Sequence, residues 1–273
     1  METIIKRTFF KFFVPTLVSS IALAVISMTD LIVAGQLLGK EAFTAISLAL
    51  PVTIFVQIIA AVFGGGAAIV LSNLLGQGDL QRCNRVFTTS IVSSVVIGVI
   101  TAVMGTIFLE PLIVALGGKP GQMMDSASQY IGILMLGMPF MILAPILQTF
   151  LRNDSNPRYS MICVLTSGLW NLMVNIVLVL VFHMGIAGIA LGTVTSQILS
   201  CILSGCKVFR KKSSFHLCSS GWSIKEVKAI VQPGLPAALS FFLQVILTIV
   251  INHTLMSTGG ADAVAVYAVV KYL

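Results

Sequence analysis

Charged residues are scarce in this sequence of 273 residues, where Asp, Glu, Lys and Arg together make up 9%. Soluble globular domains average about 25% of such residues, which they need to cover their surface. Hydrophobic residues reach 57% of the chain, and the mean hydropathy is +1.04. The shortage of charge excludes a soluble globular protein and indicates a polytopic protein of the lipid bilayer.

Residues that bind metals or catalyse acid–base reactions are also few. The chain has three well-separated histidines, and its five cysteines form no CxxC pair. Metal sites and catalytic sites usually draw on clustered His, Cys, Asp and Glu side chains. The sequence therefore predicts no organic cofactor and disfavours a membrane-embedded enzyme.

Long apolar segments are what the sequence has in abundance. A helix needs about 20 mostly apolar residues to cross the hydrocarbon core, and the short alternating segments of a barrel are missing here. The fold is predicted to be all-α and polytopic. We expect seven spans, at residues 12–38, 44–74, 87–109, 129–151, 160–182, 185–206 and 235–257.

Basic residues are distributed unevenly between the predicted loops. Thirteen lie in the amino-terminal segment and in every second loop after it, whereas only Lys40 and Lys119 lie in the intervening loops. Cytoplasmic loops carry the excess of Lys and Arg. We therefore expect a multi-pass protein of the cell membrane with a cytoplasmic amino terminus. The net charge of +7 then needs no nucleic acid partner to explain it.

A weak internal repeat suggests two lobes. The segments VPTLVSS and LPAALSF share an offset of 221 residues between Pro15 and Pro236, and the same offset relates Gly39 to Gly260. An even number of spans precedes each copy, so the repeat would be parallel. We expect a six-helix lobe at 1–206, a cytoplasmic linker with an interfacial helix at 207–234, and the start of a second lobe at 235–273.

The last apolar segment, 263–273, is too short to cross a bilayer. We therefore expect a truncated chain that ends near the start of an eighth span. A genuine truncation would leave either a half-transporter that self-associates to complete its cavity or a lobe that transports nothing.

Several stretches together resemble the multidrug and toxic compound extrusion (MATE) transporters. The first is FVPTLVSSIALAVISMTDLIVAGQLLGKEAFTAISLALP, and others are LRNDSNPRY and NIVLVLVFHMGIAGIALGTVTSQ. The resemblance implies two six-helix lobes facing a central cavity. It also implies a secondary active exporter, which couples inward movement of Na⁺ or protons to outward movement of small organic, often cationic, compounds.

Asp30 is the only carboxylate deep inside any of the predicted spans. An acid at that depth costs roughly 2.5–3.5 kcal/mol on insertion scales, so such residues usually serve ion binding or proton relay. The hypothesis is that Asp30 couples an ion to transport. A structural acid, hydrogen-bonded within the bundle, is the alternative.

Asn171 and Asn175 are four residues apart on the fifth predicted span, so they share one helix face. Their oxygens can bind Na⁺ together with Asp30, or they can hydrogen-bond to neighbouring helices. The resemblance implies an aspartate four residues after Asn175, but Val179 stands there. This departure favours proton coupling through Asp30 over a strong Na⁺ site, and no metal site is expected beyond a possible Na⁺ site at Asp30 and Asn175.

Two further groups of residues belong to the predicted transport pathway. A polar stripe on the sixth span is expected to line a cavity or to serve helix packing, and it includes Thr193, Ser196 and Gln197. The second group is expected to provide hinges, kinks or close helix contacts: Pro15, Pro51, Gly64, Gly65 and Gly66.

A lipid-linked saccharide flippase of related architecture is the main alternative function. Such a protein would be expected to line its cavity with several cationic side chains that bind pyrophosphate. No Lys or Arg lies in the middle of a predicted span. The sequence therefore favours export of organic compounds.

Overall fold

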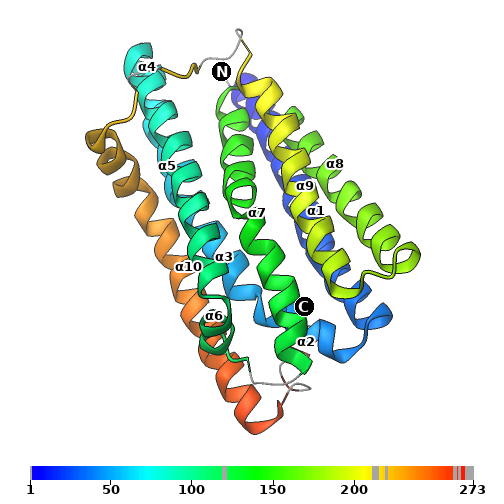
Figure 1. Cartoon of the computed structure of the whole chain (residues 1–273). Coiled ribbons are helices and arrows are strands. Elements are labelled where there is room, and N and C mark those ends of the chain that lie inside the picture. The colour runs from blue at the N-terminus through cyan, green and yellow to red at the C-terminus, as the bar shows by residue number, and fades with distance from the viewer. Residues whose placement is uncertain are drawn as a thin grey trace.

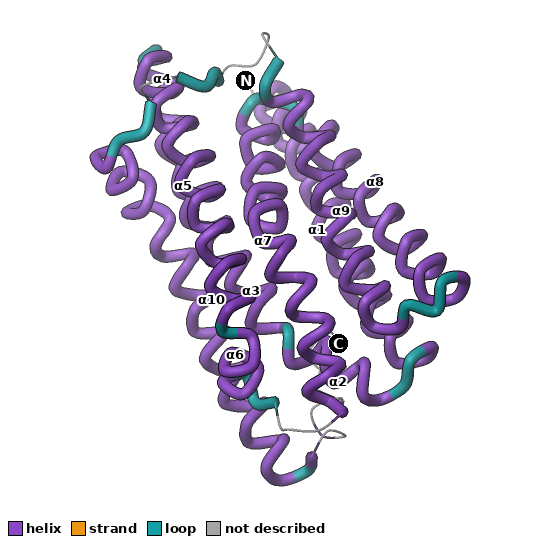
Figure 2. Tube along the Cα trace, in the orientation of Figure 1, coloured by secondary structure: helices purple, strands orange, loops and turns teal. Residues whose placement is uncertain are grey.

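The computed structural model describes residues 2–118, 122–210, 215–218, 221–260, 263, 266 and 267. Every regular element in these ranges is a helix (Figure 2). Within them, seven helical segments are long and apolar enough to cross a membrane. The all-α class and the seven predicted spans are thus confirmed.

The helices follow the predicted spans closely. The first span is α1 (Glu2–Leu37), and the second combines α2 (Lys40–Leu48), α3 (Leu50–Ala60), the π-helical η1 (Ala61–Gly66) and α4 (Ala67–Gln77). The third is α5 (Leu80–Ile107), followed by the short α6 (Leu109–Ala115), and the fourth is α7 (Gln122–Asn153). The fifth combines α8 (Pro157–Ile176) with the π-helical η2 (Val177–Val181), and the last two are α9 (Gly185–Val208) and α10 (Ile224–Thr258).

Helix α10 begins earlier than the predicted seventh span. Ser223 caps it, since its hydroxyl accepts a hydrogen bond from the backbone N–H of Lys225 at 3.3 Å. The helix then continues through Pro233 and Pro236 without a break. The amphipathic segment that was expected to form an interfacial helix is therefore the first part of α10 itself.

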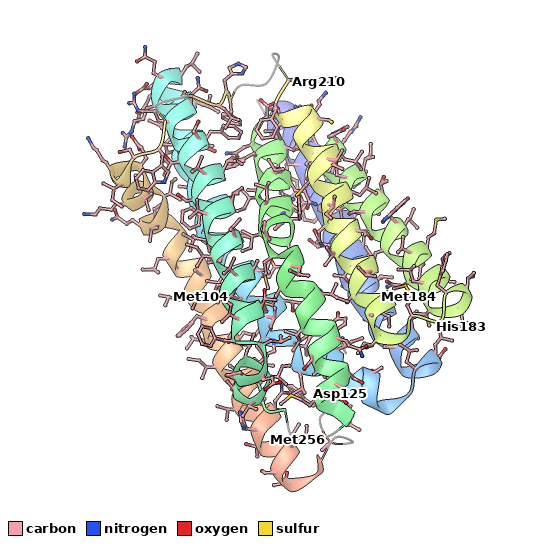
Figure 3. The ribbon with its side chains drawn as sticks, viewed as in Figure 1. Met104, Asp125, His183, Met184, Arg210 and Met256 are labelled. Atoms are coloured by element: carbon pink, nitrogen blue, oxygen red, sulfur yellow. The ribbon has the colours of Figure 1, made fainter. Side chains whose placement is uncertain are left out.

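The two ends of the bundle differ in charge. The chain begins at the end where α4 meets α5 and where α9 finishes (Figure 1). Arg210 lies at this end, whereas Asp125 and Met256 lie toward the opposite one (Figure 3). We call the end of the bundle at which Arg210 lies the amino-terminal end. Most of the basic residues belong to segments at this end, which is the asymmetry that the sequence predicts.

Helix α7 forms the centre of the bundle. It lies between α5 and α9 in Figure 1 and packs against both. Its side chains Met138, Ile142 and Phe150 are fully buried. Close contact with α5 depends on Gly98, because a Cβ there would lie 2.7 Å from the Cα of Pro139.

The glycine triplet in η1 faces three different surroundings. A Cβ on Gly64 would lie 3.3 Å from the side chain of Ile146 in α7, whereas one on Gly66 would overlap the carbonyl oxygen of Ile230 in α10. A Cβ on Gly65 would meet nothing within 4 Å. Two of the three glycines therefore permit a close approach of neighbouring helices.

The two prolines with expected kinks lie in different positions. Pro15 is inside the continuous helix α1, where the Ser19 hydroxyl donates to its carbonyl oxygen at 2.7 Å. Pro51 lies at the start of α3, just after the break at Ala49 between α2 and α3. Proline is well tolerated there because the first N–H groups of a helix have no partner within it.

Residues 215–218 and 221–222 of the predicted linker are held against α5. The His216 N–H donates to Asn84 Oδ1 at 2.8 Å, and the indole N–H of Trp222 donates to Ser93 Oγ at 3.1 Å. Phe215 is fully buried and stacks on Phe87 at a centroid distance of 5.7 Å. This segment therefore packs on α5.

Helices α1 and α10 share local features at the offset of the sequence repeat. The Ser240 hydroxyl donates to the Pro236 carbonyl at 3.4 Å, as Ser19 does to Pro15. Gly39 and Gly260, which follow the two helices, both have positive φ angles, of 85° and 65°. Such angles favour glycine, so the repeat recurs in the turns as well as in the sequence.

Candidate functional site

A polar cavity of about 730 Å³ lies inside the bundle. It is lined mainly by side chains of α1, α3, α7, α8 and α9, and Phe241 of α10 also borders it. Most of the bundle surface is apolar, so the polar lining is distinctive. Its polar members are Thr16, Ser19, Ser20, Thr53, Gln57, Tyr130, Gln148, Thr149, Arg152, Ser167, Asn171, Thr193, Ser196 and Gln197.

The two predicted asparagines meet the sixth span beside this cavity, which Asn171 lines. Asn175 Nδ2 donates to Asn171 Oδ1 at 3.4 Å, and Asn171 Nδ2 lies 3.5 Å from Thr193 Oγ1. Asn171 and Asn175 are 2% and 0% exposed. Gly192 permits this contact between α8 and α9, because a Cβ there would overlap Asn175 Oδ1. The set gathers several amide and hydroxyl oxygens in the protein interior.

The polar stripe on α9 faces the same cavity. Thr193, Ser196 and Gln197 all line it, as the spacing of the stripe predicts. The Thr193 and Ser196 hydroxyls donate to carbonyls of their own helix, at 3.1 and 2.7 Å. A hydroxyl oxygen that donates in this way can also accept a hydrogen bond, as Thr193 does from Asn171.

Asp30 lies in α1, but its side chain lies outside the described part of the structure. Its contacts with Asn171 or Asn175 thus remain a prediction. Val179, at the position where the family resemblance implies an acid, is 5% exposed and lies within the π-helical η2. A valine there gives the interior neither charge nor a ligand oxygen.

Sequence reasoning missed the polar residues that α7 contributes. Gln148 Nε2 donates to Ser200 Oγ of α9 at 2.7 Å, and Arg152 donates to Thr149 Oγ1 at 2.9 Å. The spacing of Gln148, Thr149 and Arg152 places them on adjoining faces of one helix, which was a usable signal. The predicted spans place Arg152 in a loop, although α7 extends through it to Asn153.

A second, apolar pocket of about 360 Å³ lies between α1 and α8. Ile21, Val25 and Leu169 help to line it, and Asn171 is the one polar residue among its described lining residues. The two helices approach closely there, because a Cβ on Gly168 would overlap Ile26. Asn171 therefore borders both the polar cavity and this groove.

The seven apolar helices define this chain as a multi-pass membrane protein, and they surround a cavity that polar side chains help to line. The chain belongs to the MatE family, whose family model matches residues 15–177. The resemblance to MATE transporters is thus confirmed, and the family is one of transporters, not of enzymes.

Related proteins extend the match to nearly the whole chain. The multidrug export protein MepA of Staphylococcus saprophyticus is 29% identical, with coverage of 94% of this chain and 57% of the relative. MepA of Staphylococcus aureus strain MRSA252 is 28% identical, with the same coverage. The MATE multidrug transporter DinF-BH, solved in complex with the dye rhodamine 6G, superposes with a TM-score of 0.89 at 22% identity, covering 96% of this chain and 59% of that one. The chain thus spans a little over half the length of these relatives.

Proposed function

We propose that this protein acts in secondary active export of small organic compounds across the cell membrane. The observation that carries the proposal is the polar cavity of about 730 Å³ inside an apolar bundle. Ligand cavities of about 300–1,000 Å³ hold drug-sized molecules. The names of the MepA relatives and the dye complex of DinF-BH point to the same activity.

The coupling ion is proposed to be a proton that Asp30 carries. Asn171, Asn175 and Thr193 supply neutral oxygens, which suit Na⁺ only weakly without a nearby charge. Val179 removes the acid that the family resemblance implies beside Asn175. A Na⁺ site that joins Asp30 to Asn175 is the alternative.

The proposed orientation places the amino-terminal end of the bundle in the cytoplasm. The excess of Lys and Arg at this end supports it, because cytoplasmic segments carry more basic residues. Substrate would then enter the cavity from the cytoplasm and leave on the side of Asp125 and Met256.

A transport assay with the protein in liposomes tests this proposal. The transported compound is the dye bound to DinF-BH, which we call rhodamine from here on. An imposed pH gradient is expected to drive rhodamine across the membrane, and a protonophore is expected to stop it. A Na⁺ gradient of the same size, at equal pH on both sides, is the matched condition for the alternative ion. Absence of rhodamine movement under either gradient would refute the proposed function.

The flippase alternative receives little support from the cavity. Recognition of a pyrophosphate group usually takes several cationic side chains. Among the cavity-lining residues that the structure describes, Arg152 is the one charged side chain. A cavity with one cation suits a small organic ligand better than a diphosphate.

A further inference from the structure

Arg152 lines the polar cavity without an acidic partner. Within the described residues, no carboxylate forms an ion pair with its guanidinium, and no acidic side chain lines the cavity. Its hydrogen bonds go to two hydroxyl groups, Thr149 Oγ1 at 2.9 Å and Ser160 Oγ at 3.5 Å. A charge withdrawn from water is costly unless it is paired, so this guanidinium needs a counter-charge from elsewhere.

The two hydroxyls hold the guanidinium in place. The Thr149 hydroxyl donates to the Pro145 carbonyl at 2.9 Å, and the Ser160 hydroxyl donates to the Gln148 carbonyl at 3.1 Å. Each hydroxyl proton is thereby occupied, which leaves the oxygen lone pairs to accept from Arg152. Ser160 is 1% exposed and fixes the start of α8 to the end of α7.

The remaining donors of Arg152 suit a planar or tetrahedral anion. Guanidinium carries five N–H donors in a fork that matches carboxylate and phosphate oxygens. The described contacts use two of the nitrogens, Nη1 and Nη2, and leave further donors beside the cavity. The hydroxyls of Ser19 and Ser20 line the same cavity, but each donates to a carbonyl of its own helix, so the guanidinium is the donor that a bound anion would use.

We propose that Arg152 forms an anion-binding subsite at the amino-terminal end of the cavity, which takes a carboxylate or phosphate group of the transported compound. This inference rests on the proposed export function and narrows its substrate class. It assigns zwitterionic and anionic organic compounds to the cavity, beyond the cations that the family resemblance implies. The negative headgroup of a membrane lipid has the same chemistry and is the competing source of the anion.

Binding of two matched dyes to the protein in lipid nanodiscs tests the subsite. Rhodamine carries its carboxyl group as an ethyl ester, and hydrolysis of that ester gives the free acid on the same ring system. In the wild-type protein the free acid is expected to bind about tenfold more tightly than rhodamine, because a hydrogen-bonded charge pair adds that much affinity. Arg152→Gln should remove this preference and leave rhodamine binding within about twofold.

Control variants distinguish the effect of the Arg152 subsite from the effect of the overall positive charge at the amino-terminal end. Arg158→Gln removes an exposed cation six residues away that does not line the cavity, and it should keep the preference for the free acid. Arg152→Lys keeps the charge but loses the fork, so it should retain only part of the preference. The wild-type comparison of the two dyes needs no variant and therefore holds even if Arg152→Gln fails to fold.

The outcomes of the binding experiment distinguish a substrate subsite from the alternatives. Equal binding of the two dyes to the wild-type protein would overturn the subsite and leave export of cations intact. Binding of neither dye would overturn both the subsite and the proposed function. If the preference for the free acid disappears when anionic phospholipid replaces the neutral lipid, the subsite belongs to a lipid headgroup and its assignment to substrate is wrong.

Discussion

Gly66 of η1 and Gly234 of α10 face each other where the second and seventh spans cross. A Cβ on Gly66 would lie 3.0 Å from the backbone nitrogen of Gly234, and a Cβ on Gly234 would lie 2.8 Å from the Cα of Val62. Helices in membranes associate through such close backbone contacts because lipid offers no hydrophobic driving force between them. The crossing therefore fixes α10, the first helix of the predicted second lobe, against the first lobe.

Gly66→Ala is expected to destabilise the protein, because the new methyl group meets backbone atoms that cannot move alone. Overpacking of this kind costs about 1–3 kcal/mol. Gly65→Ala is the matched control, since its methyl group meets nothing within 4 Å. Thermal unfolding in detergent should show a lower Tm for Gly66→Ala only. Equal Tm values for the two variants would contradict the close crossing.

Arg82 and Glu226 form a second connection between the first lobe and α10. Arg82 Nε lies 3.2 Å from Glu226 Oε1, and the side chains are 35% and 5% exposed. Arg82→Ala leaves a nearly buried carboxylate without its partner, which is expected to cost about 1–3 kcal/mol. Arg85→Ala, on an exposed neighbour, should change stability by less than about 0.5 kcal/mol.

The double variant Arg82→Ala with Glu226→Ala tests whether the two residues act together. If the pair is coupled, the double variant loses less stability than the sum of the single ones. Chemical unfolding in mixed micelles can measure all four proteins of this cycle. Simple additivity would show that Glu226 is stabilised by other groups.

The spans were predictable from the sequence because length and hydropathy alone decide what can cross a bilayer. The helix that Ser223 caps was predictable too, but its continuity with the seventh span was not, since Lys225, Glu226 and Lys228 make its first turns look like a separate surface helix. Ser223 caps those turns, and Arg82, 144 residues away in the sequence, holds them against α5 through Glu226. Contacts at that separation leave no local pattern.

The site was partly predictable for a similar reason. Asn171 and Thr193 stand out as polar residues in apolar spans, and helical periodicity places each on a defined face. Periodicity cannot say which faces meet, so the contact of Asn175 with Gly192 emerges only from the packing of α8 on α9. Arg152 was missed because a basic residue near the end of a span usually marks a loop.

Val179→Asp is expected to create a Na⁺ response that the wild-type protein lacks. The new carboxylate would lie about one helical turn after Asn175 and would supply the charge that a Na⁺ site needs. A ligand that binds the folded state raises its stability, so Na⁺ should raise the Tm of this variant. Val179→Asn, a neutral variant of similar shape, is the control. The same Na⁺ effect in both variants, or in neither, would contradict the role of this position.

Asp30→Asn is expected to abolish coupled export while the protein still folds. Asparagine has nearly the same shape as aspartate but cannot take up or release a proton at neutral pH, so a mechanism that depends on protonation of Asp30 stops. The initial rate of rhodamine transport under a pH gradient should fall at least tenfold. Asp125→Asn, at an exposed position in the first turn of α7, should leave that rate unchanged.

A measurement of rhodamine binding distinguishes loss of ion coupling from loss of the substrate-binding site. If Asp30 carries the coupling proton, Asp30→Asn should still bind rhodamine in nanodiscs, but binding should no longer release or take up protons in weakly buffered solution. A variant that transports rhodamine at the wild-type rate would show that Asp30 is a structural acid. Asp30 is the one carboxylate deep inside any span of this sequence. Without it, the coupling group would have to be a residue other than a carboxylate in the middle of a span.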